Sequence, residues 1–470
     1  MEERDKRRVL AGVMLSIFLA AMESTVVATA MPKVVTSLGG LQIYSWVFSG
    51  FLLTSTVTMP LWGRLSDLFG RRPMFLLGLG IFLVGSALSG LSRNMVELIA
   101  FRMLQGLGAG SLMTIGMTIV GDIFTIERRA KSQGYLSGVW GIASLVGPLL
   151  GGFLTDHVSW RWVFYINVPF GALAMFLIGT SLHEDAARRR TPVIDYAGLV
   201  LFAIGVSTLL LAAVEAGRAG VWTGLDVAGP AVVSVVALAA FVAVERRARE
   251  PIVPLGLFTN RMVLAAVLTG FFSGMAMFGA ISFVPLFLQA VTGTTATGAG
   301  IVLIPFILGW VLLSIVSARM VLRTGYRTLV LTGMVLLTVA FMLFSRWGEG
   351  LTSLGAMRDV FIAGVGMGMT FVPMLIGVQS AVPRSELGVA TSVTQFFRAV
   401  GGAIGLSLMG AVMAQRLRAG LPMEVALHGA FVLGLVVCLA AVASALIVPG
   451  GRARELARAD MRGEPTQAGG

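Results

Sequence analysis

One acidic and two basic side chains lie inside long apolar stretches, where a charge is costly and usually serves a function. The acid, Glu23, lies 15 residues beyond Arg8, or about 22 Å along a helix. A carboxylate at this position can take up and release a proton near neutral pH, or bind a cation. Alternatively, Glu23 is a structural carboxylate paired with a neighbour, or a polar residue near the opposite surface.

The two bases are Arg102 and Arg398, and an arginine inside an apolar stretch needs a partner or water. Arg102 lies about two turns into its stretch. It can pair with Glu23 or with a backbone carbonyl and so tune a proton site, or its guanidinium can reach back to the nearer surface. Arg398 lies in the middle of its stretch and faces either a central cavity or a contact between helix bundles.

The composition is that of a helical membrane protein with many spans. Of the 470 residues, 56% are hydrophobic and 12% are charged, against about 25% charged in a soluble domain, and the mean hydropathy is +0.89. Uncharged runs long enough to cross a bilayer recur, whereas a membrane β-barrel would show alternating segments of about ten residues. We predict an all-α fold with 14 spans. They are placed at 9–31, 42–62, 73–92, 95–119, 131–155, 161–182, 195–215, 225–244, 262–290, 297–318, 326–345, 355–380, 387–414 and 425–449.

Basic residues are distributed unevenly between alternate connections, which supports an even number of spans. With 14 spans, both chain ends lie at the same membrane face. The segments at that face carry 25 of the 35 Lys and Arg residues, and those at the opposite face carry 8. Cytoplasmic loops are the ones enriched in Lys and Arg. We therefore expect both termini to be cytoplasmic, in a bacterial inner (plasma) membrane, and we interpret the first apolar run as a span and not as a signal peptide.

Other classes of function have no support in the sequence. The net charge of +12 is spread over short loops, so nucleic acid is not an expected partner. The three histidines are widely separated and the single cysteine, Cys438, lies in an apolar run, so we expect neither a metal site nor an intramolecular disulfide. No Walker motif or nucleophile elbow is present, and we expect no cofactor and no enzymatic activity.

An internal repeat divides the chain. Gly70 and Gly325 are 255 residues apart, the glycine triplets in 106–110 and 364–368 are 258 apart, and 147–148 and 401–402 are 254 apart. This near-constant separation predicts two homologous six-helix bundles. The predicted domains are an N-terminal bundle at 1–182, linkers with two inserted helices at 183–261, a C-terminal bundle at 262–450 and a cytoplasmic tail at 451–470.

Glycines at small-x-x-x-small spacing indicate close packing of helices, and Gly147-Pro148 removes a backbone N–H from its helix, which favours a hinge. The 25 methionines and 28 phenylalanines are able to line an adaptable cavity, although most are expected to face lipid or core. The residues that we expect to line a substrate cavity are Glu23, Gln105, Trp140, Phe278, Gln289, Gln395 and Arg398.

Several motifs resemble those of one transporter family. The stretch 63–72, interpreted as a charged loop, has the pattern G-x-L-x-D-x-x-G-R-R; 102–110 has R-x-x-Q-G-x-G-x-G; 147–152 has G-P-x-x-G-G. In this order they resemble the motifs of the drug:proton antiporters of the major facilitator superfamily. The runs 23–32 and 160–169 are similar to those of the 14-span subfamily.

The resemblance implies a two-bundle fold and an exporter that exchanges protons for substrate by alternating access. It also implies that Asp67, Arg71 and Asp122 form a conformational latch at the cytoplasmic face, with Asp67 capping a helix and Arg71 bridging to Asp122. Two positions depart from the family pattern: Ala143 replaces a usual glycine, and Glu23 stands where many members have Asp.

We therefore expect a proton-coupled exporter of amphipathic drugs or other hydrophobic compounds, with Glu23 and Arg102 at the proton site. The expected partners are a small hydrophobic or cationic substrate, protons and membrane lipids, and the chain is expected to act as a monomer. One alternative is export of a lipid or an endogenous hydrophobic metabolite. Another is a transporter-like membrane sensor, although cytoplasmic segments of about 20 residues leave little room for an output domain.

Overall fold

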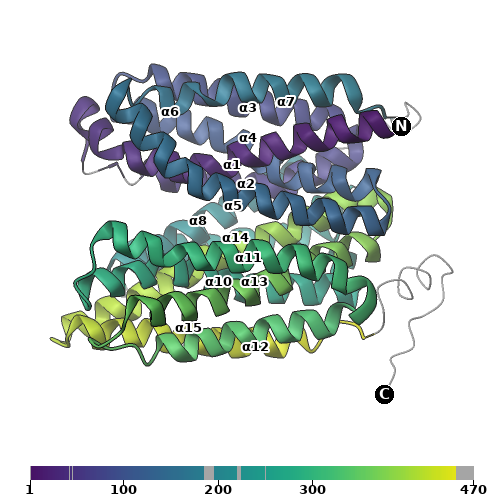
Figure 1. Ribbon diagram of the computed structural model, residues 1–470. Helices are drawn as coiled ribbons and strands as arrows, with labels where there is room; N and C mark the ends of the chain where they lie inside the picture. Colours follow the sequence, from purple (N-terminus) through teal and green to yellow (C-terminus); the bar gives the residue numbers. More distant parts are fainter. Residues whose placement is uncertain are drawn as a thin grey trace. The chain divides into compact units, whose positions relative to one another are not determined.

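A computed structural model describes residues 2–41, 43–44, 46–184, 195–219, 224–248 and 250–450 (Figure 1). Every regular element in these residues is a helix, so the predicted all-α fold is confirmed. The chain forms two compact units, which are described one at a time. The predicted tail 451–470 and the linker residues 185–194 lie outside the described residues.

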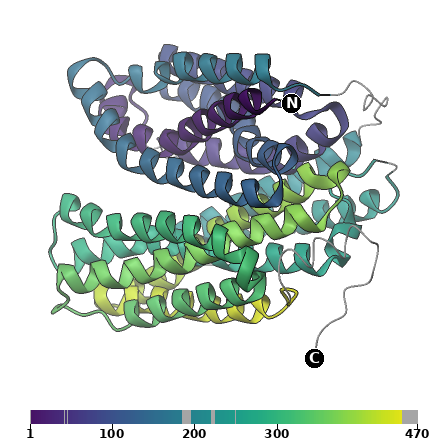
Figure 2. The same ribbon diagram turned by 45° about the vertical axis from the view of Figure 1, so that its right-hand side comes forward.

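The first unit comprises Met1–Asp195 together with the short segments Arg249–Val253 and Pro383–Val393. Its long helices lie roughly side by side (Figure 1, Figure 2). They are α1 (Glu3–Leu38), α2 (Trp46–Phe69), α3 (Arg71–Leu91), α4 (Met95–Ile123), α5 (Ile126–His157), α6 (Trp162–Tyr165) and α7 (Asn167–Ser181). The short helices α6 and α7 together form one apolar run, Trp162–Ser181.

The second unit comprises Tyr196–Ala248, Pro254–Val382 and Thr394–Gly470. Its helices are α8 (Tyr196–Ala219), α9 (Leu225–Glu245), η2 (Leu255–Thr259), α10 (Arg261–Ala290), α11 (Ala296–Thr324), α12 (Tyr326–Phe344), α13 (Ser353–Ala381), α14 (Leu387–Arg418) and α15 (Met423–Ala445), and η3 (Arg384–Glu386) precedes α14. The first turns of α14 and all of η3 fall in the segment that belongs to the first unit.

Thirteen helices among the described residues are long and apolar enough to cross a membrane, and thirteen of the predicted spans fall in them. The remaining predicted span, 42–62, overlaps α2, which begins at Trp46 and has 24 residues and a length of about 36 Å. Buried hydroxyl side chains such as Thr54 and Thr58 lower the apolarity of α2. Thr54 donates to Met103 O at 2.9 Å, so these groups are satisfied inside the unit.

The stretch 63–72 differs from the predicted loop. Helix α2 continues to Phe69 and α3 begins at Arg71, so only Gly70 is not helical. Its φ is +100°, a conformation that residues with a side chain rarely adopt. Gly325, its counterpart in the repeat, joins α11 to α12 with φ +84°. A single glycine therefore turns the chain at both places, and the charged side chains lie on helix ends.

Three glycines bring α4 into backbone contact with its neighbours. A Cβ atom at Gly106 would lie 2.6 Å from Phe51 O of α2, and one at Gly110 would lie 2.7 Å from another α2 carbonyl. At Gly108 the added atom would lie 2.9 Å from Phe82 Cα of α3. Atoms cannot approach this closely without a shift, so only glycine allows these helices to pack backbone against backbone.

The second unit repeats this arrangement. A Cβ at Gly364 or Gly368 of α13 would meet the backbone of α11, and one at Gly366 would lie 2.6 Å from Gly333 O of α12. A pair of glycines in α5 and a pair in α14 also make matching helix contacts. Gly147 and Gly151 of α5 lie against α1, and Gly401 and Gly405 of α14 lie against α10. The repeat in the sequence is therefore also a repeat of helix contacts.

Helices α8 and α9, which the sequence predicts as an insertion, pack against each other in the second unit. Ser234 Oγ of α9 donates to Gly205 O of α8 at 2.7 Å. Phe202 of α8 contacts Phe241 of α9 and Phe396 of α14, with ring centroids 5.2 Å apart in both pairs. Aromatic contacts thus connect the inserted helices to one helix of the bundle.

Replacing Gly108 by alanine is expected to lower the free energy of unfolding by about 1–3 kcal/mol, because the new methyl group overlaps the backbone of α3. Gly152→Ala is the matched control, since a Cβ there meets nothing within 4 Å. Thermal unfolding of the purified protein in detergent measures both. Equal melting temperatures for the two variants would contradict the backbone contact of α4 with α3.

Candidate functional site

Glu23 of α1 and Arg102 of α4 form a buried ion pair in the first unit. Arg102 Nη1 donates to Glu23 Oε1, and each side chain is 1% exposed. Arg102 Nε also donates to Val47 O at 3.3 Å. Arg102 therefore has both kinds of partner considered from the sequence, a carboxylate and a backbone carbonyl, and does not reach back to the surface.

Two amides and a hydroxyl complete the hydrogen bonds of this pair. Glu23 Oε2 accepts from Asn167 Nδ2 at 2.6 Å, and Gln105 Oε1 accepts from Arg102 Nη1 at 2.7 Å. Asn167 Nδ2 also donates to Ser86 Oγ at 2.9 Å. All five side chains are buried. Each carboxylate oxygen of Glu23 has its own donor, as a buried charge requires.

Aromatic rings cover the guanidinium of Arg102. Its central carbon lies 4.1 Å from the ring centroid of Phe51 and 5.8 Å from that of Phe164. These distances allow attraction between the cation and the ring faces. Ser86 Oγ donates to Phe164 O at 2.8 Å, which connects α6 to α3. In such apolar surroundings the two charges interact strongly, so a change in the charge of Glu23 has a large effect on Arg102.

Asn167 and Ser86 are not among the site residues that the sequence predicts. Asn167 lies where α6 ends and α7 begins, and its signal is an amide in the apolar run 160–169, two residues before Pro169. A serine inside a span gives no such signal, since it usually bonds to its own helix. Gln105 Nε2 and Asn167 Oδ1 have no hydrogen-bond partner among the described residues. The site thus holds an unused donor and an unused acceptor next to its acid.

A second charged cluster in the first unit lies where α2 meets α3. The Asp67 carboxylate accepts the backbone N–H groups of Gly388 at 3.0 Å and Val389 at 2.8 Å, in the first turn of α14. Asp67 also pairs with Arg71, and both side chains are buried. The carboxylate satisfies two N–H groups that have no partner in their own helix and lies at the positive end of the helix dipole.

Arg71 and Asp122 both bind the segment that precedes α14. Arg71 Nη2 donates to Arg384 O at 3.2 Å, and its Nη1 donates to Ser66 Oγ at 3.0 Å. Asp122 pairs with Arg384 at 3.7 Å, and the bridge from Arg71 to Asp122 that the family resemblance implies stays a prediction. Glu184 accepts from the backbone N–H of Arg71 at 2.6 Å. Because these partners are far apart in the sequence, no local pattern indicates them.

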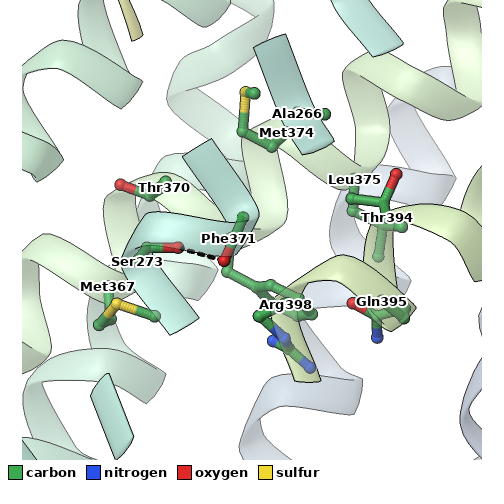
Figure 3. A pocket seen from close by; sticks show the side chains of 11 residues that line it. Ala266, Ser273, Met367, Thr370, Phe371, Met374, Leu375, Thr394, Gln395 and Arg398 are labelled. Carbon is green, nitrogen blue, oxygen red and sulfur yellow. Dashed lines mark hydrogen bonds between the residues drawn. The ribbon is translucent and has the colours of Figure 1, made fainter. Parts of the chain in front are cut away.

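The second unit contains a pocket between α10, α13 and α14 (Figure 3). Its empty volume is about 390 Å³, which includes the open mouth. Two of the expected cavity residues, Gln395 and Arg398, line it from α14, and Met367, Phe371 and Met374 of α13 are among its apolar lining residues. Apolar side chains with a few polar groups among them are the usual lining of a small-molecule site.

The other expected residues lie outside this pocket. Trp140 is half-buried in α5, and Phe278 is half-buried in α10. Gln289 is exposed near the end of α10, where its Nε2 donates to Pro285 O at 3.3 Å. Gly147-Pro148 lies inside α5, with Gly147 against α1.

The sequence model of the Major Facilitator Superfamily matches residues 13–406 of this chain. The chain belongs to this superfamily. It is 39% identical over 417 residues to the "Multidrug transporter protein MdtP" of Bacillus subtilis, covering 88% of this chain and 76% of that one. It is 35% identical to "Multidrug resistance protein 3" of the same organism, covering 86% and 79%.

Two solved structures show the fold of the superfamily at lower identity. The human organic anion transporter MFSD10 has a TM-score of 0.65 and 18% identity, covering 93% of this chain and all of that one. The proton:xylose symporter XylE has a TM-score of 0.66 and 12% identity, covering 93% and 95%. As a superfamily member, the chain is a multi-pass membrane transporter of small molecules and not an enzyme.

Arg102→Met is expected to lower the free energy of unfolding of this superfamily member by about 3–5 kcal/mol, because it leaves the buried Glu23 carboxylate unpaired. The double variant Glu23→Gln with Arg102→Met is expected to lose less than the sum of the two single losses. Thermal unfolding in detergent measures all three. Arg93→Met, which removes an exposed arginine, is the control. Strictly additive losses would show that the two side chains are not coupled.

Proposed function

We propose that this chain is a proton-coupled exporter of amphipathic drugs or other hydrophobic compounds, which works by alternating access. The observation that carries the proposal is the Glu23 carboxylate, fully buried and held by Arg102 and Asn167. The relatives named as multidrug transporters support the choice of substrate. The distribution of basic residues supports cytoplasmic termini in a bacterial plasma membrane.

Protonation of Glu23 supplies the coupling step in this proposal. While Glu23 is ionised, it neutralises the charge of Arg102 inside the bundle. A proton on Glu23 removes this compensation, and Arg102 then favours any conformation in which it regains water or another acceptor. Asn167 Oδ1, which has no partner among the described residues, is placed beside the carboxyl group and is able to accept its proton in a hydrogen bond.

The Asp67 cluster supplies a conformational latch in the same proposal. Asp67 and Arg71 join the end of α2 to the start of α14, and α14 continues into the second unit from Thr394 on. Breaking these bonds releases the first turn of α14. The cluster contains no part of the pocket around Arg398, so it is expected to set the balance between conformations and not the choice of substrate.

Glu23→Gln is expected to abolish proton-driven efflux, because the amide cannot exchange a proton while it keeps the shape of the side chain. The assay reconstitutes the purified protein into liposomes, imposes a proton gradient and follows a fluorescent amphipathic dye. We expect the wild type to move dye against its concentration gradient. The variant is expected to allow at most downhill exchange, with a loss of uphill transport of about a hundredfold or more.

Glu349→Gln is the matched control, since Glu349 is exposed and lies outside both charged clusters. It is expected to transport as the wild type does. Uphill efflux that persists in Glu23→Gln would show that another group couples to the proton. Failure of the wild type to move any dye calls for a lipid flux assay in the same liposomes, because lipid export is the alternative substrate class.

Asp67→Asn is expected to open the contact between α2 and the start of α14. A cysteine at Ser392 reports on it, because Ser392 is buried against Gly63 of α2. In a background with Cys438→Ser, a water-soluble maleimide is expected to label this cysteine slowly. Asp67→Asn should raise the labelling rate by about five- to thirtyfold, because it removes the stabilising charge at the N-terminal end of α14.

Asp226→Asn, which neutralises an exposed acid of α9, is the control and should leave the labelling rate unchanged. Substrate preference is measured in parallel with the efflux assay. If Asp67→Asn altered only that preference and left the labelling rate at the control value, the cluster would be part of a substrate site and not a latch.

A further inference from the structure

The pocket of the second unit contains a cation for which the described part of the chain supplies no counter-charge. Arg398 of α14 lines the pocket together with residues of α10 and α13, and its side chain is half-buried (Figure 3). Its guanidinium lies 4.2 Å from the ring centroid of Phe371. Among the residues that the structure describes, Arg398 has no ion pair and no side-chain hydrogen bond, in contrast to Arg102, whose N–H groups bind three oxygen atoms.

No acidic group is available to neutralise Arg398 within the three helices of the pocket. Helices α10 and α14 carry no Asp or Glu. The single acid of α13, Asp359, is paired with Arg358 and accepts from Trp347 Nε1 at 2.9 Å. It precedes the pocket residue Met367 by 8 residues, or about 12 Å along the helix.

The repeat shows that the second unit lacks the acid and base of the first. The matching glycine contacts align Glu23 with Phe272 and Arg102 with Val360. Arg398 has no charged counterpart either, because the residue 254 positions earlier is Ser144. Arg398 is therefore an addition specific to the second unit, and its charge is not part of a duplicated ion pair.

The other residues of the pocket suit the head and body of an amphipathic ligand. Hydroxyl groups of Ser273, Thr370 and Thr394 line it together with Arg398, and methionine and phenylalanine side chains supply adaptable apolar surface. A guanidinium binds carboxylate or phosphate through two parallel hydrogen bonds. Because an uncompensated charge is costly in these surroundings, a ligand that brings the opposite charge gains affinity by removing this cost.

We propose that this pocket selects substrates with an anionic head group, a carboxylate or a phosphate, on an apolar body. The proposal rests on the proposed export function and narrows its substrate class. Arg398 binds the anion, Phe371 holds the guanidinium plane, and the apolar lining accommodates the body of the ligand. Zwitterionic compounds with a carboxylate fit this site, whereas a compound with only a positive charge gains nothing from Arg398.

Equilibrium binding to the purified full chain tests this with three probes that share one apolar body. They are pyrenebutyrate, pyrenebutanol and pyrenebutyl-trimethylammonium, measured in phosphatidylcholine nanodiscs with empty discs subtracted. The wild type is expected to prefer the carboxylate. Arg398→Gln should weaken carboxylate binding by about ten- to hundredfold and change the alcohol by less than about twofold, as expected for loss of a charge-assisted hydrogen bond.

Two further variants make the test specific. Arg398→Lys keeps the charge but not the paired hydrogen bonds. We expect it to lose a smaller part of the affinity for the carboxylate probe and none for the other two probes. This result supports the proposal even if Arg398→Gln fails to fold. Arg323→Gln removes an exposed arginine of α11 and should bind as the wild type does. Equal weakening of all three probes, unchanged carboxylate binding in Arg398→Gln, or a preference of the wild type for the cationic probe would overturn it.

A lipid head group and a free solute both supply an anion, and a second arm separates them. Nanodiscs that contain phosphatidylglycerol are expected to block the carboxylate probe if the natural ligand is a lipid, and to leave it bound if the ligand is a solute. The binding assay uses no gradient. Failure of proton-driven efflux in the wild type would therefore contradict the export function while leaving anion binding intact. Carboxylate binding that does not depend on Arg398 would contradict the anion site while leaving the export function intact.

Discussion

The buried ion pair of Glu23 and Arg102 imposes the strictest requirement on the first unit. Moving one such charge from water to a medium of low dielectric constant costs about 20 kcal/mol in the idealised limit, and mutual attraction offsets this only when the remaining polar atoms are also bonded. Val47 O, Gln105 and Asn167 supply these bonds. They come from α2, α4 and the start of α7, so with α1, which carries Glu23, the pair depends on at least four helices.

Close helix packing makes the buried ion pair possible, and the same glycines serve both the packing and the ion pair. Gly106 lets the backbone of α4 approach Phe51 O, and the ring of Phe51 then covers Arg102, one turn earlier on α4. Gly147 similarly lets α5 approach α1 beside Met22, the neighbour of Glu23 in the chain. The glycine motifs therefore do more than pack helices: they fix the distance at which ring, base and acid meet.

The fold and the charged residues of the site could largely be predicted from the sequence, because burial in a membrane leaves strong signals in the amino-acid pattern. Charges inside apolar runs indicated Glu23, Arg102 and Arg398, and the glycine spacing predicted the repeat that the helix contacts confirm. What escaped prediction depends on tertiary contacts. Asn167 acquires its role from a break between α6 and α7, and Asp122 pairs with Arg384 because the chain returns to it 262 residues later. The charge density of 63–72 predicts a loop, and this prediction is wrong because the single residue Gly70, with its positive φ, turns the chain.

The duplicated units have diverged in charge while keeping their helix contacts, and in the proposed function this divergence separates two tasks, proton coupling and substrate recognition. A coupling group must change its own charge, which favours an acid whose partner is already present, as at Glu23. A recognition group must keep a constant charge and leave it free for a ligand, which favours an arginine without an acid, as at Arg398. A single site could not meet both conditions. The arginine that stabilises a coupling acid is already paired with that acid, so it is not free to bind an anionic ligand. Duplication of the bundle lets one copy retain the acid–base pair while the other carries Phe272 and Val360 in its place, which in our proposal leaves its arginine available to an anionic substrate.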